Sequence, residues 1–114
     1  MGLVFVYGTL RRGERYHALL RGAQFIACYV TPPRYTMLDL GPYPGVVRGG
    51  TTAVAGEIYR VDEAMLAGLD RLEEAPHQYQ RVTMPTPHGA CWIYLYRRAG
   101  GNEPVVVGGD WLRR

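Results

Sequence analysis

The sequence contains neither serine nor lysine among its 114 residues. The first absence excludes a serine nucleophile, and the second excludes both a Schiff-base lysine and the lysine of a P-loop. All 13 basic side chains are therefore arginine, and the net charge is only +3. We expect the arginine doublets at 11–12, 97–98 and 113–114 to be solvated, although each could bind phosphate or carboxylate. So modest a charge does not indicate a nucleic-acid-binding protein.

Cysteine and histidine are scarce as well. Cys28 and Cys91 lie far apart, each within an apolar stretch, and no C-x-x-C pair exists. His17, His77 and His88 lack the spacing of metal ligands. We therefore expect two buried, reduced thiols rather than a disulfide. The sequence predicts no metal and no other cofactor.

Long apolar runs are missing too, since none approaches the roughly 18 residues needed to span a bilayer. The first residues enter an apolar run without a basic segment, so we expect no signal peptide. Val6 stands where a myristoylation motif needs Ser or Thr. The length fits a single domain over residues 1–114, and the composition is that of an ordinary globular protein. We expect a cytoplasmic protein without membrane contact.

What is present is mainly a pattern of strands. Short apolar or alternating runs bounded by Gly and Pro predict strands over 3–7, 24–30, 34–40, 52–61, 79–86, 90–97 and 105–107. Residues 87–89 would close a hairpin, and Gly56 suggests a bulge or a close backbone approach. Helical spacing predicts helices over 14–21 and 62–74, and 41–45 is a rigid irregular loop. These elements indicate an α+β domain built on a curled sheet or barrel.

Glu73 is the most informative residue, because it is a carboxylate on the apolar face of a predicted helix. Asp62 fits the N-cap position of this helix. At about 100° per residue, the apolar side chains fill one arc of about 120°: Met65, Leu66, Leu69 and Leu72. Glu73 falls inside that arc. A carboxylate that faces a core must be neutralised, hydrogen-bonded or functional. Glu73 is therefore the candidate general base.

Other interpretations of this region stay open. Glu73 could be a structural residue at the core boundary, with its side chain bent toward water. Asp70, one turn earlier, could pair with Glu73, but its position favours a salt bridge or solvation. We place His77 at the surface. The large aromatic side chains elsewhere favour the core over a ligand platform: Trp92, Tyr94 and Trp111.

Residues 7–13, Tyr-Gly-Thr-Leu-Arg-Arg-Gly, follow an apolar strand and precede a predicted helix. Gly8 and Gly13 permit backbone conformations that point successive N–H groups into one concavity, which suits a carboxylate or another small anion. Neither the dinucleotide-binding spacing G-x-G-x-x-G nor a Walker lysine is present. An ordinary strand-to-helix connection is the alternative interpretation.

Several short motifs together resemble the gamma-glutamylcyclotransferase-like family. They stand in the family's order along nearly the whole chain: YGTL at 7–10, GPYPG at 41–45, GEIYRV at 56–61, LDRLE at 69–73, YQR at 79–81 and GDW at 109–111. Each motif is weak alone, but six in the right order are specific. Within the family, the chain is similar to the small bacterial members and to the gamma-glutamylamine cyclotransferases.

The resemblance implies a small mixed β-barrel with two flanking helices and a cavity at one end. It implies a substrate loop whose backbone amides hold the α-carboxylate of a glutamyl group, formed by Tyr7, Gly8, Thr9 and Leu10. It places Glu73 at the family's catalytic acid/base position, Tyr79 at its pocket tyrosine and Tyr43 beside the cavity. Glu74 is a departure, because the family usually has Gly there. If the helix ends early, this second carboxylate would raise the pKa of Glu73 and disfavour an anionic substrate.

The activity that the resemblance implies is an intramolecular acyl transfer. The α-amine of a γ-glutamyl amine or γ-glutamyl amino compound attacks its own γ-carbonyl, which forms 5-oxoproline and releases the amine, with Glu73 as general acid/base. The nucleophile belongs to the substrate, in agreement with the missing serine and lysine. The alternatives are a non-catalytic module for a small carboxylated metabolite and, less favoured, an oligonucleotide-binding barrel. We expect a small-molecule partner, no nucleic acid, and a monomer or weak homodimer.

Overall fold

Five strands form the main sheet of the molecule. The structure is a computed structural model that describes residues 2–114. The sheet has the order β2-β5-β1-β7-β6, with its members at Gly2–Val6 (β1), Gln24–Val30 (β2), Ala55–Val61 (β5), Tyr79–Met84 (β6) and Cys91–Tyr96 (β7). Its pairs are antiparallel except for β1 and β7, which run parallel. Because β1 is the central strand, it is covered on both faces, as its continuous apolar run predicts.

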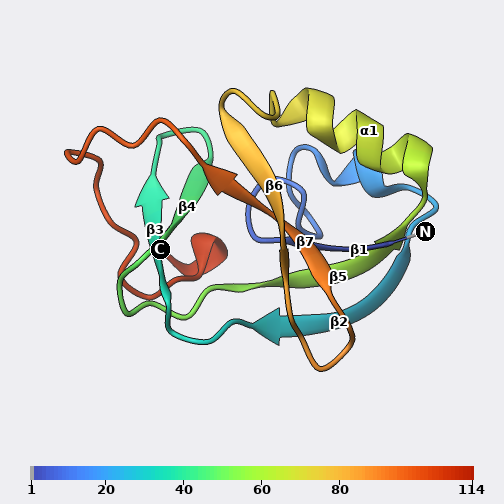
Figure 1. The fold of residues 1–114 in the computed structure, drawn as a ribbon, viewed down its shortest axis with the longest axis horizontal. Helices are drawn as coiled ribbons and strands as arrows, with labels where there is room; N and C mark the ends of the chain where they lie inside the picture. The colour runs from blue at the N-terminus through green and yellow to red at the C-terminus, as the bar shows by residue number, and fades with distance from the viewer. Residues whose placement is uncertain (1) are drawn as a thin grey trace.

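The sheet has different partners on its two faces. On one face, Val4 and Val6 of β1 share a buried cluster with Leu69 of the helix α1 (Glu63–Leu72). On the other, Phe5 packs with Met37 of β3 (Tyr35–Asp39), Val46 of β4 (Pro44–Arg48) and Trp111 of the short 3-10 helix η2 (Trp111–Arg113). Figure 1 shows α1 at the upper right and the β3–β4 pair at the left, beside the red C-terminal segment. Alternate residues of β1 therefore serve two cores.

The helix α1 begins and ends with recognisable caps. The Asp62 carboxylate accepts the backbone N–H of Met65 at 2.7 Å, so Asp62 is the N-cap as predicted. At the other end, the N–H of Ala75 donates to Asp70 O at 3.0 Å and that of Glu74 to Arg71 O at 3.2 Å. This pair of bonds is a Schellman motif. Glu74 has a φ of 51°, the left-handed conformation that this motif requires. The helix therefore ends at Leu72, and Glu73 is its C-cap.

Gly56 marks a close approach between β5 and β1. The register pairs Val6 with Glu57 and Phe5 with Ile58. A Cβ added at Gly56 would collide with the carbonyl oxygen of Val6 and with the Phe5 ring. The prediction of a close backbone approach is confirmed.

The expected closed barrel is not found in the part of the chain that the structure describes. β3 and β4 form a separate two-stranded sheet, and β2 and β6 remain the edges of the five-stranded one. Only single bridges extend the small sheet, one from Tyr35 to Thr52 and one from Leu38 to Val105. The predicted strand over 105–107 is reduced to the second of these bridges. The architecture is a mixed α+β fold.

The predicted helix over 14–21 is wrong, because only His17–Leu20 (η1) is helical and it is a 3-10 helix. The chain from residue 8 onward advances in tight turns, for example from Arg11 N–H to Gly8 O at 3.0 Å and from Glu14 N–H to Arg11 O at 3.0 Å. Gly13 then takes a φ of 85°, which no α-helix contains. The structure thus has one α-helix among residues 2–114, where two were expected.

Cys28 does not lie in the core, contrary to expectation. It lies on the edge strand β2 and is exposed, whereas Cys91 on the inner strand β7 is buried as predicted. Both thiols are free. In residues 2–114, no helix combines the length and the apolarity that crossing a membrane would require.

Candidate active site

A cavity of about 300 Å³ opens where the end of β1, the end of α1 and the start of β6 meet. This volume is sufficient for a small metabolite. The cavity is lined by every residue to which the sequence assigned a catalytic or binding role: Tyr7, Gly8, Thr9, Leu10, Tyr43, Glu73 and Tyr79. These residues come from four separate segments of the chain, which only the fold brings together.

Glu73 lies in this cavity without a partner for its charge. No hydrogen bond or ion pair reaches its carboxylate from any of the described residues, 2–114. Burial raises the pKa of Glu73 to about 7. Glu74 follows directly, but its side chain is exposed, and burial alone accounts for the shift in the pKa of Glu73. A carboxylate with a pKa near neutrality can both take up and return a proton.

The hydroxyl groups of Tyr7 and Tyr79 are engaged in holding the cavity wall. Tyr7 donates to the carbonyl oxygen of Tyr94 at 2.6 Å and accepts the backbone N–H of Val46 at 3.2 Å. Tyr79 donates to the carbonyl oxygen of Pro44 at 2.7 Å. Burial, together with the nearby Glu73 carboxylate, raises the pKa of both tyrosines far above the ordinary value. Both rings are therefore neutral walls of the cavity that tie it to β4.

Along residues 8–10, the carbonyl oxygens have partners and the amides do not. Gly8 O accepts from Arg11 N–H at 3.0 Å, Thr9 O from Tyr16 N–H at 2.9 Å, and Leu10 O lies 2.9 Å from His17 Nδ1. The N–H groups of the same three residues have no acceptor within the described part of the chain. Gly8 and Leu10 are buried, so these donors need a partner from outside the fold.

The glycine at position 8 is required by packing. A Cβ at Gly8 would lie 2.7 Å from the ring of Pro44, which also lines the cavity. Any larger residue would push the 7–10 loop away from β4. The glycine thus keeps the loop and the cavity wall in contact.

Tyr94, Gln78 and Arg15 also line the cavity, and the sequence did not assign them to it. Tyr94 lies on β7, whose two faces are both apolar or aromatic, so the sequence did not show which face meets a cavity. Gln78 Nε2 donates to the hydroxyl of Tyr43 at 3.0 Å and fixes that ring. Arg15 donates to the carbonyl oxygen of Pro42 at 2.9 Å, beside the opening.

Asp70 has the structural role that its position on the helix favoured. Its Oδ1 accepts the Tyr94 hydroxyl at 2.7 Å and forms an ion pair with Arg81 Nε at 3.0 Å. It therefore does not pair with Glu73. His77 is exposed and Trp111 is buried, as predicted. Within residues 2–114, no three His, Cys, Asp or Glu side chains gather in a way that could hold a metal ion.

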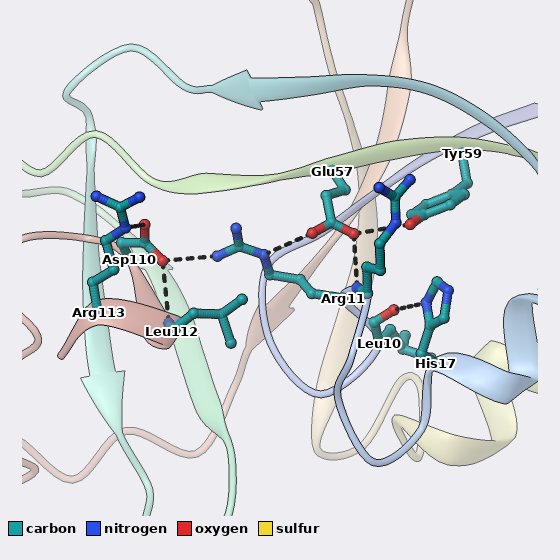
Figure 2. A network of polar contacts seen from close by, with 9 residues as sticks. Leu10, Arg11, His17, Glu57, Tyr59, Asp110, Leu112 and Arg113 are labelled. Atoms are coloured by element: carbon teal, nitrogen blue, oxygen red, sulfur yellow. Dashed lines mark hydrogen bonds and ion pairs between the residues drawn. The ribbon is translucent and has the colours of Figure 1, made fainter.

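Arg11 was expected at the solvated surface, and this expectation is wrong. Its side chain is only 11% exposed and lies between Glu57 and Asp110, as Figure 2 shows. Glu57 could have been found by the argument that identified Glu73, because it is a carboxylate within a buried strand. Arg12 is exposed, with its guanidinium 4.9 Å from the centre of the Phe25 ring.

Comparison with known proteins decides the family. The family described as gamma-glutamyl cyclotransferase, AIG2-like, matches residues 4–113. The chain belongs to this family. A Vibrio cholerae relative is 47% identical over 112 residues, which are 98% of this chain and 96% of that protein. The human gamma-glutamylaminecyclotransferase is 41% identical over 117 residues, covering 91% of this chain and 71% of its own length.

A solved structure of a family member agrees with the fold. The solution structure of the Escherichia coli protein ytfP superposes with a TM-score of 0.80 at 37% identity, over 96% of each chain. The resemblance inferred from six short motifs is therefore confirmed, and with it the assignment to the gamma-glutamylcyclotransferase-like class of enzymes.

Proposed function

We propose that this family member converts a γ-glutamyl amine or γ-glutamyl amino compound into 5-oxoproline and a free amine. The observation that carries the proposal is the pair of chemical groups that line one cavity of about 300 Å³. The cavity is lined by Glu73, whose carboxylate has no hydrogen-bond partner among residues 2–114, and by residues 8–10. The three backbone N–H groups of residues 8–10 have no acceptor in the described part of the chain. The first can transfer a proton, and the second can hold an anion.

The N–H groups of Gly8, Thr9 and Leu10 would bind the α-carboxylate of the glutamyl group. Successive backbone amides are good carboxylate ligands, because they concentrate partial positive charge without a counter-ion. The rings of Tyr7, Tyr43 and Tyr79 would enclose the aliphatic part of the substrate. The leaving amine would then point toward the opening.

The chemistry needs no protein nucleophile. Glu73 accepts a proton from the substrate's α-ammonium group, and the freed nitrogen attacks the γ-carbonyl carbon. A new C–N bond closes the five-membered ring, the old C–N bond breaks, and Glu73 returns its proton to the leaving nitrogen. The attacking nitrogen loses a second proton as it becomes the lactam N–H, and the released amine takes it up to leave as an ammonium ion. Well-oriented intramolecular attack can supply as much as about 7–11 kcal/mol. The acid–base step typically adds about 10²–10⁴-fold.

A relative's name supports an amine as leaving group, since the human protein is named a gamma-glutamylaminecyclotransferase. We propose the cytoplasm as the compartment, because free thiols such as those of Cys28 and Cys91 persist in reducing surroundings. A monomer or a weak homodimer remains our prediction for the assembly.

The test is turnover by the purified protein on a panel of γ-glutamyl amines and γ-glutamyl amino acids, with 5-oxoproline as the measured product. We expect release from at least one panel member, and a loss of kcat of about 10²-fold or more in Glu73→Gln. Glu63→Gln is the matched control, because it neutralises an exposed carboxylate of the same helix that does not line the cavity, and it should keep wild-type turnover.

Two outcomes would contradict the proposal. Binding of 5-oxoproline without turnover of any panel member would favour a non-catalytic binding module. Wild-type turnover in Glu73→Gln would remove Glu73 from the mechanism. The folding of each variant is checked by circular dichroism, so that a loss of activity is not mistaken for the effect of unfolding.

A further inference from the structure

A buried carboxylate holds the 7–10 loop from the side away from the cavity. Glu57 of β5 is 6% exposed. It accepts a hydrogen bond from Arg11 Nε at 3.2 Å and one from the backbone N–H of Arg12 at 2.9 Å. Both donors follow directly after Leu10, and neither they nor Glu57 lines the cavity. Figure 2 shows the contact between Arg11 and Glu57. The residues that fix the loop therefore lie outside the cavity.

Glu57 is itself held firmly in place. Its backbone is paired with Val6, the last residue of β1, and Gly56 lets β5 come close at this point. Its Oε1 also accepts the hydroxyl of Tyr59 at 2.9 Å. With three donors around one carboxylate, the side chain has little freedom to move.

Arg11 connects this anchor to the end of the chain. Its Nη1 lies 2.8 Å from Asp110 Oδ1, and the same oxygen accepts the backbone N–H of Leu112 at 3.1 Å. One guanidinium is therefore shared by two carboxylates from segments far apart in sequence (Figure 2). The contact joins three motifs of the family, around residues 8–11, 57 and 110.

We propose that Glu57 and Arg11 are positioning residues that set the direction of the backbone N–H groups of residues 8–10. This inference rests on the proposed function. The upstream end of the loop is fixed by β1, and the downstream end by the bond from Arg12 N–H to Glu57. Losing that acceptor would let the downstream peptide planes rotate, which would change the directions of the three N–H groups relative to one another.

The proposal makes a specific kinetic prediction. The α-carboxylate keeps its charge throughout the reaction, so the loop binds substrate and transition state alike. Weakening such uniform binding raises KM and leaves kcat nearly unchanged. A residue that only stabilises the fold would lower the melting temperature without changing the KM of the folded protein.

The test is Glu57→Gln, which keeps the shape of the side chain but removes its charge and one of its two acceptor oxygens. The carboxamide therefore cannot accept from both Arg11 Nε and Arg12 N–H. For a γ-glutamyl amine turned over by the wild type, we expect KM to rise about tenfold, as for one lost charged hydrogen bond. The kcat should stay within about twofold. The Kd of 5-oxoproline, measured by titration calorimetry, should rise by the same factor as KM. Asp110→Asn weakens the other ion pair of Arg11 and should produce a smaller rise in KM.

Glu103→Gln is the matched control. The Glu103 carboxylate also accepts two backbone N–H groups, from Gly100 at 2.7 Å and Gly101 at 3.0 Å, but it does not line the cavity. It should leave KM unchanged. An unaltered KM in folded Glu57→Gln, or a fall in kcat with KM unchanged, would overturn the inference. If Glu57→Gln does not fold, the KM of Asp110→Asn decides in its place. A wild-type protein that neither turns over nor binds would instead overturn the proposed function.

Discussion

Glu57 and Glu73 are two acids that the fold shields from solvent to different degrees, since Glu57 is buried and Glu73 is half-buried, and their surroundings differ as well. Glu57 is 6% exposed and accepts hydrogen bonds from Arg11, Arg12 and Tyr59. Glu73 has no such donor among residues 2–114, and burial raises its pKa to about 7. We interpret Glu57, which has three donors, as a structural carboxylate, and we predict that Glu73, which has none among residues 2–114, is the one that transfers protons.

The largest expected effect tests whether the two acids differ in their contribution to the unfolding free energy. Glu57→Ala leaves Arg11 buried with only Asp110 as partner, and breaking a buried ion pair costs about 3–5 kcal/mol of unfolding free energy. Glu73→Ala removes no hydrogen bond and relieves the desolvation that raises the pKa of Glu73, so at pH 7 we expect no comparable loss of unfolding free energy. Urea unfolding of both variants and the wild type at pH 7 measures the difference. Equal losses of unfolding free energy in the two variants would contradict the difference that we infer between Glu57 and Glu73.

The second effect concerns pH. The pKa of Glu73 is about 7 in the folded chain against an ordinary value of 4.5. Between these pH values, the folded chain binds more protons than the unfolded one. The contribution of Glu73 to the unfolding free energy therefore falls as pH rises from about 4.5 to about 7, by up to about 3 kcal/mol at 1.36 kcal/mol per pKa unit.

The measurement is the unfolding free energy of wild type and Glu73→Gln from pH 4 to pH 8. The variant lacks the titrating group, so its advantage over the wild type should grow with pH and level off above about pH 7. In the wild type, kcat/KM should rise across the same pH range, because the general base acts when deprotonated. A difference between the two proteins that does not vary with pH would show that Glu73 is not desolvated.

The sequence predicted the parts of the site that depend on local periodicity. Asp62 as N-cap and Glu73 within the apolar arc follow from local sequence and helix geometry alone. The motifs then indicated which tyrosines would line the cavity. The ion pair of Arg11 with Glu57 spans 46 positions of the sequence, and the one with Asp110 spans 99. No local pattern encodes such contacts, so Arg11 was expected in solvent.

Sheet topology was the other feature that the sequence did not predict. The sequence pattern of β2 does not show that it is an edge strand, and for this reason Cys28 was wrongly expected in the core. Strand pairing is decided by contacts between distant segments, and for the same reason the sequence could not show whether the sheet closes into a barrel. The helix over 14–21 failed because turn-forming contacts and Gly13 outweigh the helix formers of that segment.

The smallest expected effect is at Glu74, a third acid that can be compared with Glu57 and Glu73. It occupies the C′ position of the Schellman motif with a φ of 51°, where glycine carries no steric penalty. Glu74→Gly should therefore raise the unfolding free energy by about 0.5–1 kcal/mol, whereas Glu74→Ala, which keeps a Cβ, should gain nothing. Glu74 lines the cavity, but its side chain is exposed and the proposed mechanism assigns it no role, so both variants should keep wild-type kcat and KM. If both variants instead lost turnover to the same extent, the outer carboxylate would act on the substrate, and the strained backbone would serve to place it there.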